Sequence, residues 1–160
     1  MQKHTMSLLV DNEPGVLARV SGLFSGRGFN IESLCVAETL EPTVSRITLV
    51  TRGDDAVAEQ ITKQLNKLIN VIKVTDLTAT DCVEREMALI KVSAKADFRA
   101  EILRIVDIFR CKVVDVSSTH YTVEVTGTAD KLAAILRLLR PMGIKEVART
   151  GAIALAREKK

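Results

Sequence analysis

Aromatic residues are scarce in this chain of 160 residues, which has no tryptophan, one tyrosine and four phenylalanines. Proteins that bind single-stranded nucleic acids stack the bases on aromatic side chains. The chain offers few such platforms, which argues against this class of function. Its formal net charge of +3, with the excess of basic residues in the second half, is also too small to require a nucleic-acid partner.

The side chains of catalytic and metal sites are also few. The two histidines, His4 and His120, lie in no pattern that pairs them with a nucleophile and an orienting acid. The three cysteines lack the close spacing of a zinc or redox pair. A phosphate loop is absent as well, because Gly26 and Gly28 lie where a predicted helix ends rather than where one begins. We therefore expect a chain that is not an enzyme and has no cofactor or metal of its own.

Long hydrophobic runs are missing too. No apolar segment approaches the roughly 20 residues that span a bilayer, and the N-terminus has no apolar signal block. These observations predict a cytoplasmic protein without a membrane partner. The hydrophobic fraction is nevertheless 47%, against 27% charged residues, which is enough to build a folded core.

The first half of the chain alternates between strand and helix patterns. Residues 5–10 form a short apolar run that predicts a buried strand, and a helix is expected to begin with Pro14 in its first turn. Two β-prone segments separated by a break at Pro42 predict a hairpin. A second amphipathic helix and a strand at residues 71–77 complete the order βαββαβ.

The same order recurs in the second half, with a final strand expected after Gly143 and through Ala156. The chain is therefore predicted to belong to the α+β class, as two tandem ferredoxin-like βαββαβ domains. We assign residues 1–78 to the first domain, 79–83 to a linker and 84–160 to the second domain. Because such domains are small and their open sheets leave edge strands unpaired, a homodimer is expected.

The segment at residues 11–17, Asp-Asn-Glu-Pro-Gly-Val-Leu, is chemically richer than packing requires. It leads from the first predicted strand into the first predicted helix. The first amides of a helix lack internal partners and carry the positive end of its dipole, so they hold a carboxylate well. Proline has no amide hydrogen, so the predicted donors are Gly15, Val16 and Leu17. Gly15 also lets a ligand approach the backbone closely.

Two asparagines complete the predicted site. Asn12 follows the first strand and Asn30 precedes the second, and we expect the two side chains to meet across the site. Their amides offer both donors and acceptors, which suits recognition of the polar groups of an amino acid. The alternative interpretation is an ordinary helix start, in which Asn12 is simply the N-cap.

At these residues the sequence resembles the small, regulatory subunits of acetolactate synthase, also called acetohydroxyacid synthase (AHAS). The likeness extends in order over nearly the whole chain. The segments that carry it include Asn12–Leu17, Gly22–Phe24, Arg27–Leu34, Ser45–Thr48, Lys63–Leu68, Glu84–Glu86, Asp115–Val116 and Glu146–Gly151. In that family the first half is an ACT domain, an amino-acid-binding βαββαβ module, and the second half is a further, ACT-like ferredoxin fold.

The resemblance implies an effector site between the ACT domains of two copies of the chain. The matching positions are Asn12, Gly15, Val16, Leu17, Asn30 and Ile31. The family's effector is a branched-chain amino acid, usually valine. Its small subunit binds and activates a catalytic large subunit of branched-chain amino acid biosynthesis and confers feedback inhibition on it. Thiamine diphosphate, magnesium and FAD belong to that partner.

The basic second half leaves one further hypothesis, a stand-alone regulator that responds to a ligand and binds RNA or DNA. Such a protein neutralises phosphates with lysine and arginine, so its retention on nucleic acid falls steeply with salt. Salt-dependent retention would favour this hypothesis, and indifference to polyanions would remove it.

Overall fold

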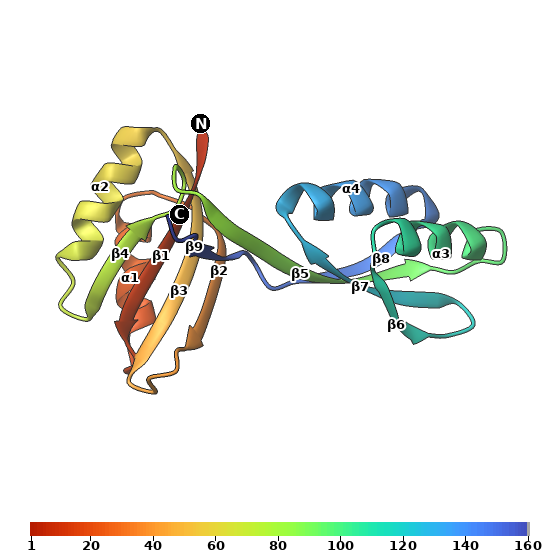
Figure 1. Ribbon diagram of the computed structural model, residues 1–160, viewed down its shortest axis with the longest axis horizontal. Helices are drawn as coiled ribbons and strands as arrows, with labels where there is room; N and C mark the ends of the chain where they lie inside the picture. The colour runs from red at the N-terminus through yellow and green to blue at the C-terminus, as the bar shows by residue number, and fades with distance from the viewer. Residues whose placement is uncertain (160) are drawn as a thin grey trace. The chain divides into compact units, whose positions relative to one another are not determined.

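The computed structural model describes residues 1–159, which divide into two compact units. The first unit comprises Met1–Val83 together with the segment that begins at Ala152, and the second comprises Glu84–Gly151. In each unit two helices cover one face of an antiparallel sheet (Figure 1). The predicted α+β class with two βαββαβ units is confirmed.

The sheet of the first unit has four strands, and two helices connect them. They are β1 (Gln2–Asp11), α1 (Val16–Gly26), β2 (Ile31–Glu38), β3 (Val44–Gly53), α2 (Asp55–Asn66) and β4 (Val71–Asp76). The strand order is β2-β3-β1-β4, and every neighbouring pair is antiparallel. Strands β2 and β4 are therefore the edges of this sheet.

The helical periodicity of the sequence explains how the two helices of this unit pack on its sheet. Val16, Val20 and Phe24 follow one another at four-residue spacing along α1, and all three are buried. From α2, Ile61 and Leu65 are fully buried in the same cluster. The helices pack on the face of the sheet that carries the alternate residues of β1 and β3, including Met6, Leu8, Val10, Ile47 and Leu49.

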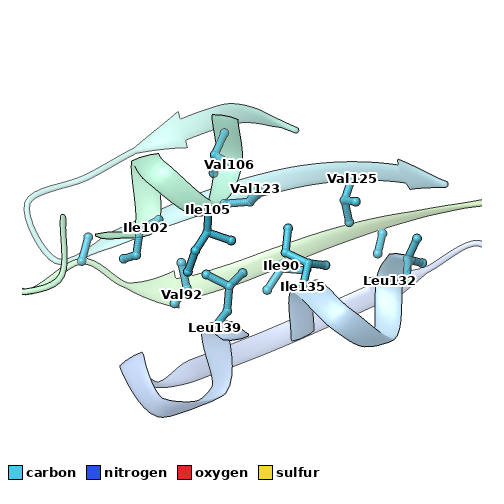
Figure 2. Packing of buried hydrophobic residues seen from close by; sticks show 12 residues of the cluster. Ile90, Val92, Ile102, Ile105, Val106, Val123, Val125, Leu132, Ile135 and Leu139 are labelled. Carbon is cyan, nitrogen blue, oxygen red and sulfur yellow. The ribbon is translucent and has the colours of Figure 1, made fainter. Parts of the chain in front are cut away.

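The second unit repeats this plan. Its elements are β5 (Cys82–Ser93), α3 (Arg99–Ile108), β6 (Lys112–Val116), β7 (His120–Gly127), α4 (Ala129–Leu139), the 3-10 turn η1 (Arg140–Met142) and β8 (Ile144–Arg149). The order β6-β7-β5-β8 matches that of the first sheet. Figure 2 shows Ile90 of β5 and Val123 of β7 close to Ile105 of α3 and Ile135 of α4, in a core built almost wholly of branched aliphatic side chains.

The C-terminal segment differs from the prediction of a single strand ending at Ala156. Strand β8 ends at Arg149, and β9 (Ile153–Ala156) begins only after Gly151, whose φ of 81° interrupts the extended backbone. Strand β9 pairs with β5 and belongs to the first unit, where Ala154 is buried. The second unit thus ends near Gly151, whereas the predicted second domain continued to residue 160.

The two sheets share a detail of register that makes their positions comparable. In the first, Val10 pairs with Val71 after an irregularity in the pairing of β1 with β4. In the second, Val92 pairs with Ile144 after the same irregularity between β5 and β8. One step beyond these pairs, Asp11 corresponds to Ser93, and Asn70 corresponds to Gly143. Along the helices, Val16, Val20 and Phe24 correspond to Phe98, Ile102 and Val106.

Candidate functional site

The turn between β1 and α1 contains the predicted amide donors. Helix α1 begins at Val16, so Pro14 lies in the turn before the helix rather than in its first turn. Gly15 is the N-cap residue, with a φ of 86° that glycine adopts without steric strain. A Cβ atom at Gly15 would have no neighbour within 4 Å. The space beside this residue is therefore open to a ligand.

The amides of this turn are largely unused. Val16 N donates to the carbonyl oxygen of Glu13 over a long 3.4 Å, and no side chain caps the helix. Within residues 1–159, the amides of Gly15 and Leu17 donate no hydrogen bond. Helix α1 thus presents unpaired N–H groups at the positive end of its dipole, an arrangement that binds anions.

Asn12 does not cap the helix, so that alternative interpretation is wrong. Its side-chain Nδ2 donates to the carbonyl oxygen of Pro42 over 2.9 Å, and its backbone N donates to that of Thr43 over 2.8 Å. Both acceptors lie in the connection between β2 and β3. Asn12 therefore links the turn to this connection by two hydrogen bonds. Its side chain is exposed at the protein surface.

The expectation that Asn12 and Asn30 meet within one chain is also wrong. Ile31 at the start of β2 pairs with Thr51, which pairs with His4 near the start of β1. Asn12 instead follows the far end of β1. The stretch of β1 between these two ends measures roughly 24 Å at about 3.4 Å per residue. The two asparagines consequently lie at opposite ends of the same sheet.

The three apolar residues of the predicted site have different surroundings. The side chain of Val16 is 4% exposed and packs in the core, so only its backbone faces the site. Leu17 is 42% exposed on the first turn of α1. Ile31 is half-buried against the core at the end of the sheet where Asn30 lies. The turn therefore offers Leu17 as its apolar contact within one copy of the chain.

Sequence reasoning missed Asn70, which lies between α2 and β4. Its side-chain Nδ2 donates to Oδ2 of Asp11 over 3.1 Å, and its Oδ1 accepts a hydrogen bond from Nη1 of Arg19. The residue is 59 positions from Asp11 in sequence, so no local motif connects the two. One signal could have been found by aligning the two halves of the chain. Gly143 takes the corresponding place in the second unit, so a polar side chain at this position is specific to the first unit.

A pocket of about 250 Å³ lies between the first turns of α1 and the connection from α2 to β4. Its apolar lining comes mainly from Val16, Val20, Leu68, Ile69 and Val71. The side chain of Ile69 is 96% exposed, so one wall of this pocket is open to solvent.

The corresponding turn of the second unit carries charged side chains in place of the glycine and the leucine. Asp97 takes the position of Gly15, and Arg99 takes that of Leu17. The guanidinium of Arg99 donates from Nε to the carbonyl oxygen of Ala94 and from Nη2 to that of Ser118, each over 2.9 Å. A carboxylate side chain and a bound arginine thus replace the open glycine turn.

Residues 1–159 contain neither a metal-binding cluster nor a membrane-spanning helix. No group of three or more histidine, cysteine or carboxylate side chains lies close enough to hold a metal ion. None of the helices in residues 1–159 has the length and apolarity needed to cross a membrane. The three cysteines are half-buried and form no disulfide.

Both units match described protein families. Residues 6–73 match the AHAS small subunit-like ACT domain. Residues 85–158 match the family described as the small subunit of acetolactate synthase. With its βαββαβ order and its open helix terminus, the first unit is an ACT domain.

Whole-chain relatives narrow this class to one family. An acetolactate synthase small subunit from Mycolicibacterium smegmatis is 54% identical over 96% of this chain and 91% of its own length. A probable one from Archaeoglobus fulgidus is 54% identical over 99% of both chains. The crystal structure of the small subunit from Thermotoga maritima covers both chains completely, with a TM-score of 0.91 and 44% identity. The chain belongs to the family of acetolactate synthase small subunits.

Proposed function

We propose that this chain regulates acetolactate synthase by binding the catalytic large subunit, raising its activity and inhibiting it when valine or another branched-chain amino acid is bound. The observation that carries the ligand site is the start of α1, where the amides of Gly15 and Leu17 have no acceptor within residues 1–159. Membership of the family supports the large subunit of acetolactate synthase as the partner. The open space beside Gly15 supports access by a small molecule.

The chemistry of the turn suits an amino acid effector. Its carboxylate is held by the amides at Gly15 and Leu17, where the helix dipole adds a favourable electrostatic interaction. The exposed side chain of Leu17 provides apolar surface for an aliphatic side chain. Asn12 already donates one hydrogen bond to Pro42, and its Oδ1 acceptor is available to the effector's ammonium group.

The separation of Asn12 from Asn30 indicates how many chains the site needs. Because the two lie at opposite ends of one sheet, a site that uses both takes one asparagine from each of two copies. Strand β2 is an edge of the first sheet and begins at Ile31, next to Asn30. Pairing of such edges between two copies would satisfy their unpaired backbone groups. We therefore propose a homodimer through the ACT domains, with effector sites completed at its interface.

The chemical reaction belongs to the partner in this proposal. Condensation of pyruvate with pyruvate or 2-oxobutyrate takes place on the large subunit, which holds thiamine diphosphate, magnesium and FAD. The small subunit acts through a coupling free energy between effector binding and partner activity, which is typically about 1–3 kcal/mol.

Two measurements test this function. Calorimetry of the full chain with valine, leucine and isoleucine should show binding of at least one of them. Mixing with an acetolactate synthase large subunit should raise the synthase activity, and the bound amino acid should then lower it. Absence of binding heat for all three amino acids, with unchanged activity on mixing, would contradict the proposal. Valine binding without any effect on the partner would contradict the regulatory part alone.

A further inference from the structure

Asn70 joins the effector turn to the rest of the ACT domain by both its backbone and its side chain. Its carbonyl oxygen accepts from Asp11 N over 2.9 Å. Its Nδ2 donates to Oδ2 of Asp11 over 3.1 Å and, more weakly, to Oε2 of Glu13 over 3.5 Å. Its Oδ1 accepts from Nη1 of Arg19, one turn into α1. One neutral side chain therefore contacts residues before, within and after the turn.

The charges around Asn70 explain why an amide suits this position. The carboxylates of Asp11 and Glu13 both lie within reach of Nδ2, and hydrogen bonding by an N–H donor satisfies them without adding a third charge. On the other side, the guanidinium of Arg19 needs an acceptor, which Oδ1 supplies. An asparagine meets both demands at once, whereas an aspartate would meet only the second.

Packing alone does not fix the turn on this side. The pocket of about 250 Å³ between α1 and the α2–β4 connection includes Arg19 and Asn70 in its lining, and Ile69 on its rim is almost fully exposed. Solvent rather than packed side chains therefore borders α1 on this side. The hydrogen bonds of Asn70 consequently carry more of the positional restraint on the turn than they would in a filled core.

The second unit shows that the fold does not require this side chain. Ser93 N donates to the carbonyl oxygen of Gly143 over 2.9 Å, which reproduces the backbone bond from Asp11 to Asn70. Gly143 has no side chain to offer, and the turn of that unit is held by Arg99 instead. The side-chain bonds of Asn70 thus accompany the open, ligand-accepting turn and not the βαββαβ fold as such.

We propose that Asn70 is a positioning residue of the effector site, which holds the turn in the conformation that presents the amides of Gly15 and Leu17 to a carboxylate. The inference rests on the proposed function. Its physical basis is preorganisation, because a turn that is already ordered loses less conformational freedom when the effector binds. Without the side-chain bonds, the effector must also order the turn, and its affinity falls.

The substitution Asn70→Asp separates the role of the side-chain donor, Nδ2, from that of the acceptor, Oδ1. It preserves the shape of the side chain and the acceptor for Arg19, and it replaces the donor by an oxygen that faces Asp11 and Glu13. The matched control is Asn66→Asp, because Asn66 is exposed at the end of α2 and its side chain makes no hydrogen bond within residues 1–159. Asn70→Gly copies the second unit and removes the side chain without adding charge.

At pH 7.5 we expect Asn70→Asp to weaken binding of the parent's effector about tenfold by calorimetry, and Asn70→Gly to weaken it less. Asn66→Asp should stay within about twofold of the parent chain.

Amide NMR spectra of the ligand-free chains separate failure of this inference from failure of the proposed function. In Asn70→Asp, the signals of Gly15 and Leu17 should shift while those of the second unit keep their parent positions, whereas Asn66→Asp should leave the Gly15 and Leu17 signals unchanged; a general structural defect would instead shift signals throughout the first unit. If the parent binds no branched-chain amino acid, the proposed function fails, and these signals still decide whether Asn70 positions the turn. Unchanged signals in Asn70→Asp, or parent-like effector affinity, would overturn the inference.

Discussion

The first and second units share a fold and a register but differ at the start of their first helices. In the first unit the turn contains Gly15 with a φ of 86°, and the amides of Gly15 and Leu17 are unpaired within residues 1–159. In the second unit Asp97 and Arg99 take these two positions, and the guanidinium binds the carbonyl oxygen of Ala94 in this turn and that of Ser118 between β6 and β7. A duplicated scaffold therefore carries one open glycine turn and one turn that is closed by a bound arginine.

The difference teaches that uncapped amides at a helix start make an anion site only where the space in front of them is open and free of a competing carboxylate. Every helix has free amides at its start, and most proteins satisfy them with capping side chains. Both α2 and α4 are capped in this way, by Asp54 and Thr128. Helices α1 and α3 both lack such a cap. What distinguishes α1 is the open space beside Gly15, where the second unit has the side chain of Asp97.

The largest expected effect comes from Gly15→Asp, which gives the first turn the residue of the second. A carboxylate would occupy the place of the effector's own carboxylate, and an L-residue at this φ is strained by roughly 1–2 kcal/mol. We expect effector affinity to fall at least about thirtyfold, which corresponds to roughly 2 kcal/mol. Activation of the large subunit should survive. Calorimetry and the synthase assay measure the two properties separately.

Two controls make this prediction specific. Gly15→Ala introduces the backbone strain without the charge and should weaken binding less than Gly15→Asp. Gly22→Asp introduces the same charge in the middle of α1, where a Cβ atom also has open space, and should leave effector affinity near that of the parent. An effector affinity of Gly15→Asp equal to that of the parent would show that the carboxylate is held elsewhere.

A second contrast between the two units concerns a buried charge. Glu86 in β5 takes the position that His4 has in β1. Glu86 is 8% exposed and accepts two hydrogen bonds from the guanidinium of Arg149, over 2.6 and 3.1 Å. These bonds raise the pKa of Arg149. Because Glu86→Gln removes a charge-assisted pair from a largely buried position, we expect a loss of about 2 kcal/mol in stability. Urea unfolding, monitored with signals from the second unit, would contradict this if the midpoint did not move.

The closed turn of the second unit should depend on Arg99. Replacement by methionine keeps most of the apolar stem but removes the donors to the carbonyl oxygens of Ala94 and Ser118. Since the side chain is exposed, the expected cost is about 1 kcal/mol. Effector binding at the first unit should be unaffected, because this turn takes no part in it. A change in effector affinity larger than about threefold would show that the two turns are coupled.

The smallest effect is expected at the exposed ion pair of Lys91 with Glu146. Hydrogen bonding and charge attraction from Lys91 lower the pKa of Glu146. A lowered pKa in the folded state stabilises the fold above the ordinary pKa of the carboxyl, and this stabilisation is lost as pH falls through the lowered value. Glu146→Gln should therefore leave the unfolding midpoint nearly unchanged at pH 7 and entirely unchanged at pH 2. A large shift at either pH would contradict the assignment of this pair to the solvated surface.

The fold was largely predictable from the sequence because each element has its own periodic signal. The four-residue spacing of Val16, Val20 and Phe24 predicts the buried face of α1, which the structure confirms. The break after Arg149 was not predicted, because Thr150 and Gly151 interrupt an apolar segment that otherwise reads as one strand. Only the pairing of β9 with β5 makes it clear that this segment belongs to two strands.

The parts of the candidate site that are contiguous in sequence could be predicted. The residues whose positions are set by strand pairing in the sheet could not. The donors at Gly15 and Leu17 follow from Pro14 and from the start of a helix. The placement of Asn30 depends on the order β2-β3-β1, which puts the start of β2 at the same end of the sheet as the start of β1. The role of Asn70 depends on the pairing of β4 with the end of β1. Neither strand pairing can be inferred from the local sequence.

Amide NMR of the full chain during titration with valine is the most direct test of the central claim that effector binding belongs to the open turn. The largest chemical-shift changes are expected at Gly15 and Leu17, with further changes at Asn30 and Ile31 if two copies complete the site. The amide of Arg99 in the closed turn should not move. Saturable changes at Arg99 with none at Gly15, or no saturable change at any amide, would contradict the account.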